Sequence, residues 1–156
     1  MGREIAKLLS YEGYIVGLVA RRLELLVSLE QKLLPNKVYI KQIDVTDQSA
    51  RASLKVLINE MGGDIDIVII SISAYLDNKN DGRDEWMQKK RTLDVTGKGF
   101  IAIADIAFQH FMERNHGHLV GISSTSGLWG CASGPEYSGV KAMVSTYLEG
   151  KRNQSG

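Results

Sequence analysis

Cysteine is almost absent from this chain of 156 residues, in which Cys131 is the only one. One thiol cannot form a disulfide within the chain or build a cysteine-rich metal site, so no metal is expected. Excess charge is also absent, because 19 basic and 18 acidic side chains leave a formal net charge of +1. A protein that works mainly by holding nucleic acid or an anionic membrane is normally far from this balance. We therefore expect neither of these partners.

Long apolar runs are missing as well. The sequence has no stretch of about 18 apolar residues, the length that a membrane span needs. Its opening residues, MGREIAKLLS, are charged and amphipathic and lack the apolar core of a signal peptide. With 44% hydrophobic and 24% charged residues, the composition predicts a single globular domain over residues 1–156. One free cysteine fits a reducing compartment, so a cytoplasmic location is expected.

The sequence does contain short apolar runs that alternate with amphipathic stretches. The apolar runs predict strands at residues 14–20, 37–43, 64–73 and 118–123. Apolar residues at helical spacing predict helices from the start to residue 12, over 25–33, 49–61 and 85–115 with a break near 97 or 99, and after 135. This alternation indicates an α/β fold with a doubly wound parallel sheet. Ligands bind at the carboxyl ends of such strands, which are residues 20–21, 44–45, 70–73 and 123–124.

Tyr137 and Lys141 are four residues apart on the last predicted helix and therefore share one face. An ammonium group beside a phenol favours the phenolate, which helps a tyrosine exchange a proton with an alcohol or carbonyl oxygen. Tyr75 and Lys79 have the same spacing in a predicted loop, so the spacing alone is weak and a plain surface pair is the alternative. Thirteen residues before Tyr137 stands Ser124, at a strand end, whereas the residue thirteen before Tyr75 is a glycine.

The segments GISSTSG and YSGVKA, which contain Ser124, Tyr137 and Lys141, closely resemble the catalytic segment of the short-chain dehydrogenases/reductases. These are Rossmann-fold oxidoreductases that move a hydride between a nicotinamide cofactor and a carbonyl or hydroxyl group. The family's order is kept in the segments GREIAKLL, LVARR, IDVTD, IDIVIISIS and LDVTGKGF. The resemblance covers essentially all 156 residues and implies a Rossmann-like fold, an NAD(P) cofactor and a small carbonyl or alcohol substrate.

The resemblance also implies a role for each matching residue. Tyr137 is expected to donate a proton to the substrate carbonyl in reduction and to accept one in oxidation. Lys141 is expected to favour the phenolate and to bind the nicotinamide ribose, and Ser124 to hydrogen-bond the substrate oxygen. A loop serine that caps backbone amides is the alternative for Ser124. Besides Tyr137 and Lys141, the expected cofactor contacts are Gly2, Arg21, Arg22, Asp44, Val45, Ser71 and Ser73.

Arg21 and Arg22 bear on the choice of cofactor. They stand where an acidic residue would accept hydrogen bonds from the free 2′-hydroxyl of NAD. Arginine accommodates a 2′-phosphate instead, so NADP is the expected cofactor and NAD is the second choice. Two solvated arginines at a helix start are the alternative, although positive charge is unfavourable near a helix N-terminus.

Two departures from the family pattern affect the expected site. Residues 70–73, Ile-Ser-Ile-Ser, replace Asn-Asn-Ala-Gly, which puts the side chain of Ser73 where the family has a glycine. Asp94 replaces the asparagine that anchors a water in the family's proton relay. We expect Asp94 to take part in catalysis, although an ionised carboxylate accepts hydrogen bonds and cannot donate them.

Gly2 matches the last glycine of the family's glycine-rich turn. The family's first strand and most of its pyrophosphate cradle are therefore expected to be missing, as is the family's C-terminal segment. This predicts a Rossmann-like domain that is incomplete at both ends, in which the strands at 14–20 and 64–73 lack their shared partner. Two functions compete: an NADP-dependent oxidoreductase, and a truncated, non-catalytic remnant that keeps the fold and its helix-mediated association.

The predicted helices over 95–115 and 136–150 carry apolar side chains on more than one side, namely Phe100, Ile103, Phe108, Phe111, Met143 and Tyr147. A helix of this kind is usually buried on more than one side. Members of the family that the sequence resembles commonly pair through these two helices. A homodimer is therefore expected, and a thick core within one chain is the alternative.

Overall fold

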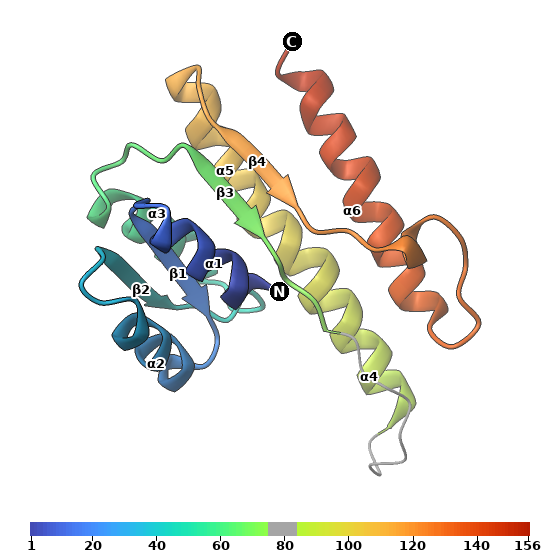
Figure 1. Cartoon of the computed structure of the whole chain (residues 1–156). Helices are drawn as coiled ribbons and strands as arrows, with labels where there is room; N and C mark the ends of the chain where they lie inside the picture. The colour runs from blue at the N-terminus through green and yellow to red at the C-terminus, as the bar shows by residue number, and fades with distance from the viewer. Residues whose placement is uncertain (75–83) are drawn as a thin grey trace. The chain divides into compact units, whose positions relative to one another are not determined.

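The computed structural model of the chain describes residues 1–74 and 84–156, and it divides the chain into two compact units, residues 1–65 and 66–156. Figure 1 shows the helices and strands of both units along the chain. The pair Tyr75 and Lys79, which has the same spacing as Tyr137 and Lys141, lies outside the described residues. That both units form a single domain stays a prediction.

The N-terminal unit alternates helices and strands in the predicted order. It consists of α1 (Gly2–Tyr11), β1 (Val16–Ala20), α2 (Leu23–Leu33), β2 (Val38–Gln42) and α3 (Ala50–Glu60). The strands β1 and β2 pair in parallel, with Val16 opposite Val38 and Ala20 opposite Gln42. α3 ends before Gly62, whose φ of +94° lies in the left-handed region that favours glycine.

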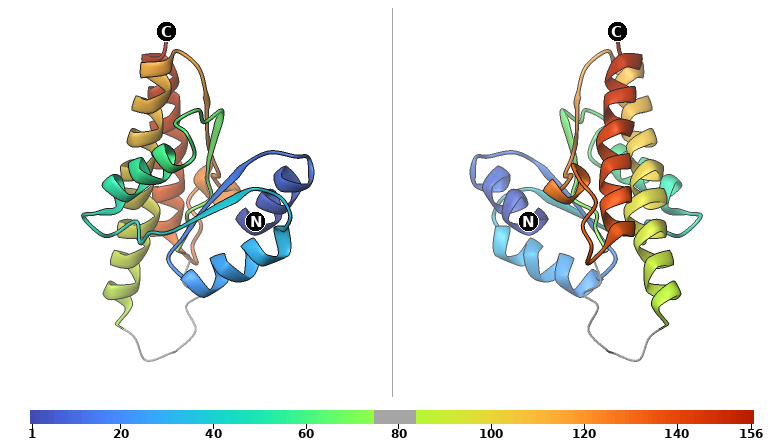
Figure 2. Two further views of the ribbon diagram at one scale, coloured as in Figure 1. Left: turned by 90° about the vertical axis from the view of Figure 1, so that its left-hand side faces the viewer. Right: turned by 90° about the vertical axis from the view of Figure 1, so that its right-hand side faces the viewer.

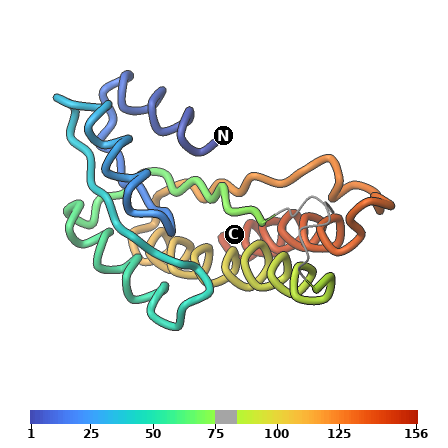
Figure 3. Tube along the Cα trace, turned by 90° about the horizontal axis from the view of Figure 1, so that it is seen from below, coloured from blue at the N-terminus to red at the C-terminus, as the bar shows by residue number. Residues whose placement is uncertain are grey.

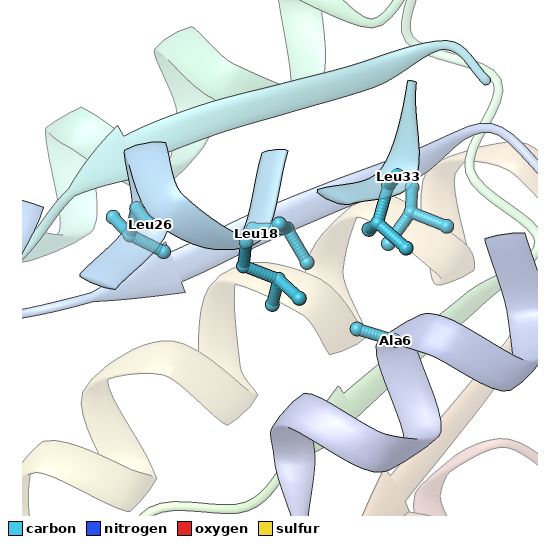
Figure 4. Packing of buried hydrophobic residues seen from close by; sticks show 6 residues of the cluster. Ala6, Leu18, Leu26 and Leu33 are labelled. Carbon is cyan, nitrogen blue, oxygen red and sulfur yellow. The ribbon is translucent and has the colours of Figure 1, made fainter. Parts of the chain in front are cut away.

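The core of this unit lies between β1, α1 and α2. Leu18 of β1, Leu26 and Leu33 of α2, and Ala6 of α1 are buried against one another, as Figure 4 shows. Strand residues alternate between the two faces of a sheet, and Gly17, between the buried residues of β1, meets side chains of α3 and of Met61 just after it. The β1–β2 pair is therefore covered by helices on both faces, and Figure 3 shows α1 and α3 on its opposite sides.

The C-terminal unit contains the strands β3 (Ile67–Ile70) and β4 (His118–Gly121), which pair in parallel. A continuous helical column of three segments joins them along the chain: α4 (Glu85–Thr92), a π-helix (Leu93–Gly99) and α5 (Phe100–Arg114). After β4 come a short 3₁₀ turn (Thr125–Gly127) and α6 (Pro135–Gln154). Figures 1 and 2 show α6 running beside this column.

Local sequence signals explain where these helices begin and change. Asp84 caps α4, because its carboxylate accepts a hydrogen bond from the N–H of Trp86 at 3.1 Å. The break predicted near Gly97 or Gly99 is the π-helix, in which the chain stays helical but is wound more widely. α5 ends at Asn115, whose φ of 54° places it in the left-handed region.

The predicted α/β fold with parallel strands is confirmed, with two differences in the strands. The strand predicted over residues 64–73 is limited to Ile67–Ile70, and residues 71–73 connect it to the next part of the chain. Among the described residues, the strands form two parallel pairs, β1–β2 and β3–β4, instead of one sheet. None of the described helices is long and apolar enough to cross a lipid bilayer.

Candidate active site

Ser124 follows β4 and begins the 3₁₀ turn Thr125–Gly127. Its backbone is extended, and its Oγ accepts a hydrogen bond from the N–H of Ser126 at 3.2 Å. The capping role that was the alternative for Ser124 is therefore present. It does not exclude the catalytic role, because a hydroxyl that accepts a hydrogen bond still has its own proton to donate.

Gly127 allows this turn to pack directly on the backbone of α6. A Cβ atom at position 127 would lie 2.8 Å from the carbonyl carbon of Lys141 and 2.9 Å from the nitrogen of Ala142. Both of these atoms belong to helix backbone and cannot move aside cheaply. A glycine is therefore required here, and it brings the turn that begins at Ser124 against the helix that carries Tyr137 and Lys141.

Lys141 is buried in α6, with 2% of its surface exposed. Its Nζ donates a hydrogen bond to the carbonyl oxygen of Ile122, just after β4, at 2.8 Å. Burial lowers the pKa of Lys141 because it disfavours the charged form, and the nearby Tyr137 partly opposes this shift. The carbonyl of Lys141 accepts a hydrogen bond from Ser123 Oγ at 3.1 Å. Both ends of this lysine are thus tied to the segment that leads to Ser124.

Tyr137 lies in the first turn of α6 and is half-buried. The Nζ of Lys141 is 5.8 Å from the centre of its ring, as the predicted one-turn spacing requires. Tyr137 lines an open cavity of about 260 Å³ together with Ser126, Cys131, Ser133 and Gly134. The structure therefore brings Tyr137 and Lys141 together, and it places the turn capped by Ser124 at the same cavity.

The loop between the 3₁₀ turn and α6 supplies cavity residues that the sequence did not single out. The N–H of Cys131 donates to Ser138 Oγ at 3.0 Å, which ties the loop to α6 beside Tyr137. The Cys131 thiol lies 3.2 Å from Ser133 Oγ, and this hydrogen bond lowers the thiol pKa. The sequence gives one signal that Ser138 belongs near the site, namely its position directly after Tyr137.

Asp94 lies on the π-helix, where lysines on both sides neutralise its carboxylate. Its Oδ1 accepts a hydrogen bond from Lys98 Nζ at 2.7 Å, and its Oδ2 is 4.0 Å from Lys90 Nζ. The hydrogen bond from Lys98 is the main cause that holds the pKa of Asp94 below its usual range. Asp94 is therefore ionised and accepts hydrogen bonds only, so it can hold a water but cannot donate to one.

The other residues predicted for the site are divided between the two units. Ser71 and Ser73 follow β3 in the C-terminal unit, with Ser73 exposed and Ser71 half-buried. The remaining five are in the N-terminal unit: Gly2, Arg21, Arg22, Asp44 and Val45. Among the residues that the structure describes, no group of three or more His, Cys, Asp or Glu side chains is placed to hold a metal ion.

Four of the N-terminal residues lie at the carboxyl ends of their strands, as predicted. Arg21 follows β1, and its side chain is exposed while its carbonyl accepts a hydrogen bond from Gln42 Nε2 at 2.9 Å. Arg22 is the exposed N-cap residue of α2. Asp44 follows β2 and accepts hydrogen bonds from both the N–H and the hydroxyl of Thr46, at 3.0 and 2.7 Å. This bonding fixes the turn that contains Val45.

The whole chain is similar to proteins of one family. The sequence profile of the short chain dehydrogenase family matches residues 1–155. An uncharacterized oxidoreductase of Staphylococcus aureus (strain USA300) is 34% identical over 152 residues, which are 96% of this chain and 64% of that protein. An NADP-dependent 3-hydroxy acid dehydrogenase of Escherichia coli (O6:H1) is 29% identical over 143 residues, 92% of this chain and 57% of its own length. The chain thus spans less than two thirds of these relatives.

Solved structures show the same similarity. The crystal structure of serine dehydrogenase from Escherichia coli matches 98% of this chain and 70% of its own, with 27% identity and a TM-score of 0.86. The closed form of serine dehydrogenase complexed with NADP⁺ matches 98% of this chain and 61% of its own, with 27% identity and a TM-score of 0.88. The observed α/β arrangement is therefore the fold of these dehydrogenases.

Proposed function

Because the chain belongs to the short chain dehydrogenase family, we propose that it acts as an NADP-dependent oxidoreductase on a small carbonyl or alcohol substrate. The observation that carries the proposal is the pair on α6, in which Tyr137 lines a cavity and the buried ammonium group of Lys141 is 5.8 Å from its ring centre. This pair is intact, together with Ser124, which favours an enzyme over a remnant without activity.

Tyr137, Lys141 and Ser124 carry the groups that a nicotinamide cofactor and a carbonyl substrate would need. When bound, the cofactor supplies the hydride. In reduction the Tyr137 hydroxyl donates its proton to the substrate oxygen, and in oxidation it accepts the proton. Ser124 donates its hydroxyl proton to the same oxygen and stabilises the charge that develops there. Lys141 has three N–H donors and gives one to Ile122, so two are left for ribose hydroxyls.

The preference for NADP is proposed from Arg21 and Arg22. Both side chains are exposed at the end of β1, where a 2′-phosphate would be held by their positive charge. A dehydrogenase similar to this chain is named NADP-dependent, and a similar structure holds NADP⁺. The proposed remaining contacts are the backbone at Gly2, the turn at Asp44 and Val45, and the segment with Ser71 and Ser73.

Replacing Tyr137 by phenylalanine tests the proposed chemistry. We expect the rate of NADPH oxidation with a reactive carbonyl compound to fall by about 10²–10⁴-fold, the usual contribution of a positioned general acid. Tyr39→Phe is the matched control, because this half-buried tyrosine also has a lysine near its ring, with Lys37 Nζ 5.3 Å from the ring centre. A Tyr137→Phe rate within about threefold of the parent, less than 1 kcal/mol of barrier, would show that Tyr137 is not the proton donor.

We also propose that two copies of the chain pair through α5 and α6. Of the apolar residues that suggested this pairing, three are buried within the chain itself: Phe100, Ile103 and Phe111. Phe108, Met143 and Tyr147 stay half-buried and support the proposal. A two-fold interface would bring each helix against its own copy. Sedimentation at micromolar concentration tests this, since a clean monomer of 17.2 kDa contradicts it.

A further inference from the structure

Two threonine hydroxyls bind the backbone of Ala74, which follows β3, one at its N–H and one at its carbonyl oxygen. The N–H of Ala74 donates to Thr96 Oγ1 at 2.9 Å, and Thr92 Oγ1 donates to the carbonyl oxygen of Ala74 at 2.9 Å. We propose that Thr92 and Thr96 are positioning residues that fix the segment from Ser71 to Ala74 for binding NADP(H). This inference rests on the proposed function.

Both hydroxyl groups are inside the C-terminal unit. Thr96 is fully buried, and 3% of the surface of Thr92 is exposed. A buried hydroxyl without a hydrogen bond costs free energy, so these two side chains need the partners that Ala74 provides. A threonine in a helix often bonds to the carbonyl four residues earlier. Thr92 makes that contact with Gln88 at 3.3 Å, but its contact with Ala74 is shorter.

The two threonines sit where the helical column changes its winding. Thr92 is the last residue of α4, and Thr96 lies within the π-helix that follows. π-helical turns are found frequently at functional sites. On this same π-helix, Gly97 packs close to α6, because a Cβ atom there would be 3.7 Å from Val140 and 3.8 Å from Met143. The π-helix therefore links the backbone at Ala74 to the helix that carries Tyr137 and Lys141.

The two hydrogen bonds of Thr92 and Thr96 with Ala74 form a clamp at one end of the segment Ser71–Ala74. β4 holds the other end of this segment. The N–H of Ile122 donates to the carbonyl of Ile70 at 3.0 Å, the contact that closes the β3–β4 pairing. Ser71 and Ser73 lie between this contact and the clamp at Ala74. Fixing both ends limits the conformations of four residues, so the entropy of ordering them is lost on folding and not on binding. This is the property that a segment approached by a cofactor needs.

The experiment compares valine and serine at each threonine in the full chain. Thr96→Val and Thr92→Val keep the side-chain shape and remove the hydroxyl, whereas Thr96→Ser and Thr92→Ser keep it. We expect each valine variant to raise the Kd of NADPH, measured by its fluorescence, by at least about fivefold, and each serine variant to stay within twofold of the parent. Thr146→Val, an exposed threonine on α6, is the matched control. All titrations are run well below the melting temperature of each variant.

Amide exchange at Ala74 gives a second readout that requires no cofactor. We expect Thr96→Val to speed exchange of this N–H about tenfold, because its acceptor is gone, with Thr96→Ser near the parent value. The inference is overturned if folded Thr96→Val and Thr92→Val chains bind NADPH as tightly as the parent, or if serine fails to restore binding. A parent chain that does not bind NADPH contradicts the proposed function instead. If one valine variant fails to fold, the other decides.

Discussion

The two compact units bury different kinds of side chain. The N-terminal unit has an aliphatic core, and Ser10 is the one polar side chain buried among its described residues. In the described part of the C-terminal unit the buried polar side chains are Thr92, Thr96, Ser138 and Lys141. Lys141 and Ser138 are in or beside the candidate active site, and Thr92 and Thr96 hold the backbone of Ala74. The difference indicates that the C-terminal unit uses hydrogen bonds inside the protein to set positions, while the N-terminal unit relies on packing.

Ser10 shows what a buried polar group does away from the site. Asn36 Nδ2 donates to both the carbonyl and the Oγ of Ser10, at 2.9 and 3.0 Å, and so joins the end of α1 to the turn after α2. The predicted ligand groups of this unit, Arg21 and Arg22, are exposed. Substitutions of these exposed arginines should therefore change cofactor binding without changing the fold. In the C-terminal unit, loss of the buried ammonium group of Lys141 should change the rate, and loss of the buried threonine hydroxyls should change cofactor binding.

The largest effect is expected from Lys141→Met, which removes the buried ammonium group. We expect the rate of carbonyl reduction to fall by about 10²–10⁴-fold, as for loss of a group that sets up general acid catalysis. Steady-state rates with NADPH measure this loss. Lys151→Met is the control, because Lys151 is on the same helix and pairs with Asp105 at 2.9 Å. Equal rates in the parent and Lys141→Met would contradict the claim that buried polar groups of the C-terminal unit set up catalysis.

Stability against pH provides a separate check on the same lysine. Burial lowers the pKa of Lys141 in the folded chain, while the unfolded value is about 10.4. Between these two values the unfolded chain binds a proton that the folded chain lacks. The contribution of Lys141 to the free energy of unfolding therefore rises with pH across this window. Urea unfolding at several pH values up to about 10.4 should show a smaller rise for Lys141→Met than for the parent. Identical slopes would mean that the pKa is not lowered.

The next effect is expected in the N-terminal unit, from Arg21→Asp. Loss of one charge-assisted contact with the 2′-phosphate should weaken NADPH binding by about 1.5–3 kcal/mol and reverse or erase the preference over NADH. Titration with both cofactors measures it, with Arg152→Asp at the exposed end of α6 as the control. Equal affinity of the parent for NADPH and NADH contradicts the assignment.

A smaller effect on stability is expected from Gly127→Ala, because the new methyl group would meet the backbone of α6. Overpacking of this kind costs about 1–3 kcal/mol, and it should also lower the rate by moving the turn capped by Ser124. Gly130→Ala is the matched control in the same loop, since a Cβ atom there meets nothing within 4 Å. Thermal unfolding and the reduction rate of both variants decide the point. Equal behaviour of the two alanine variants would show that the close packing is dispensable.

Asp94→Asn should have the smallest effect on stability. The pKa of Asp94 is held down by Lys98, so its ion pair contributes stability above the unfolded pKa of about 3.9, and this is lost as pH falls through the folded pKa. The difference in melting temperature between parent and variant should be small at pH 7, and it should vanish in 1 M salt. A difference that persists in salt would point to a contact other than the ion pair.

Much of the fold and part of the site could be predicted from the sequence. The alternation of strands and helices, the cap at Asp84 and the pair Tyr137 and Lys141 follow from local periodicity and spacing, because each depends on residues close together in the chain. The clamp at Ala74 and the bond from Lys141 to Ile122 join residues 18 to 22 positions apart. No local pattern encodes such contacts, so only the folded chain shows them. The catalytic and cofactor roles of the site residues stay predictions.

The π-helix between α4 and α5 gives this helical column one place where a residue can be lost. Its seven residues, Leu93–Gly99, are wound more widely than an α-helix, with hydrogen bonds that span five residues instead of four. Deleting one of them would let the column relax into a continuous α-helix. Because the wider turn holds about one residue more than an α-helical turn, α5 would keep its rotation relative to α4. Phe100 and Ile103 would stay in the core, and Asp105 would stay beside the Tyr147 hydroxyl that donates to it at 2.5 Å. A deletion within α4 or α5 would instead turn the rest of the column by about 100°. Single deletions should therefore be tolerated within the π-helix and rejected in the α-helices on either side.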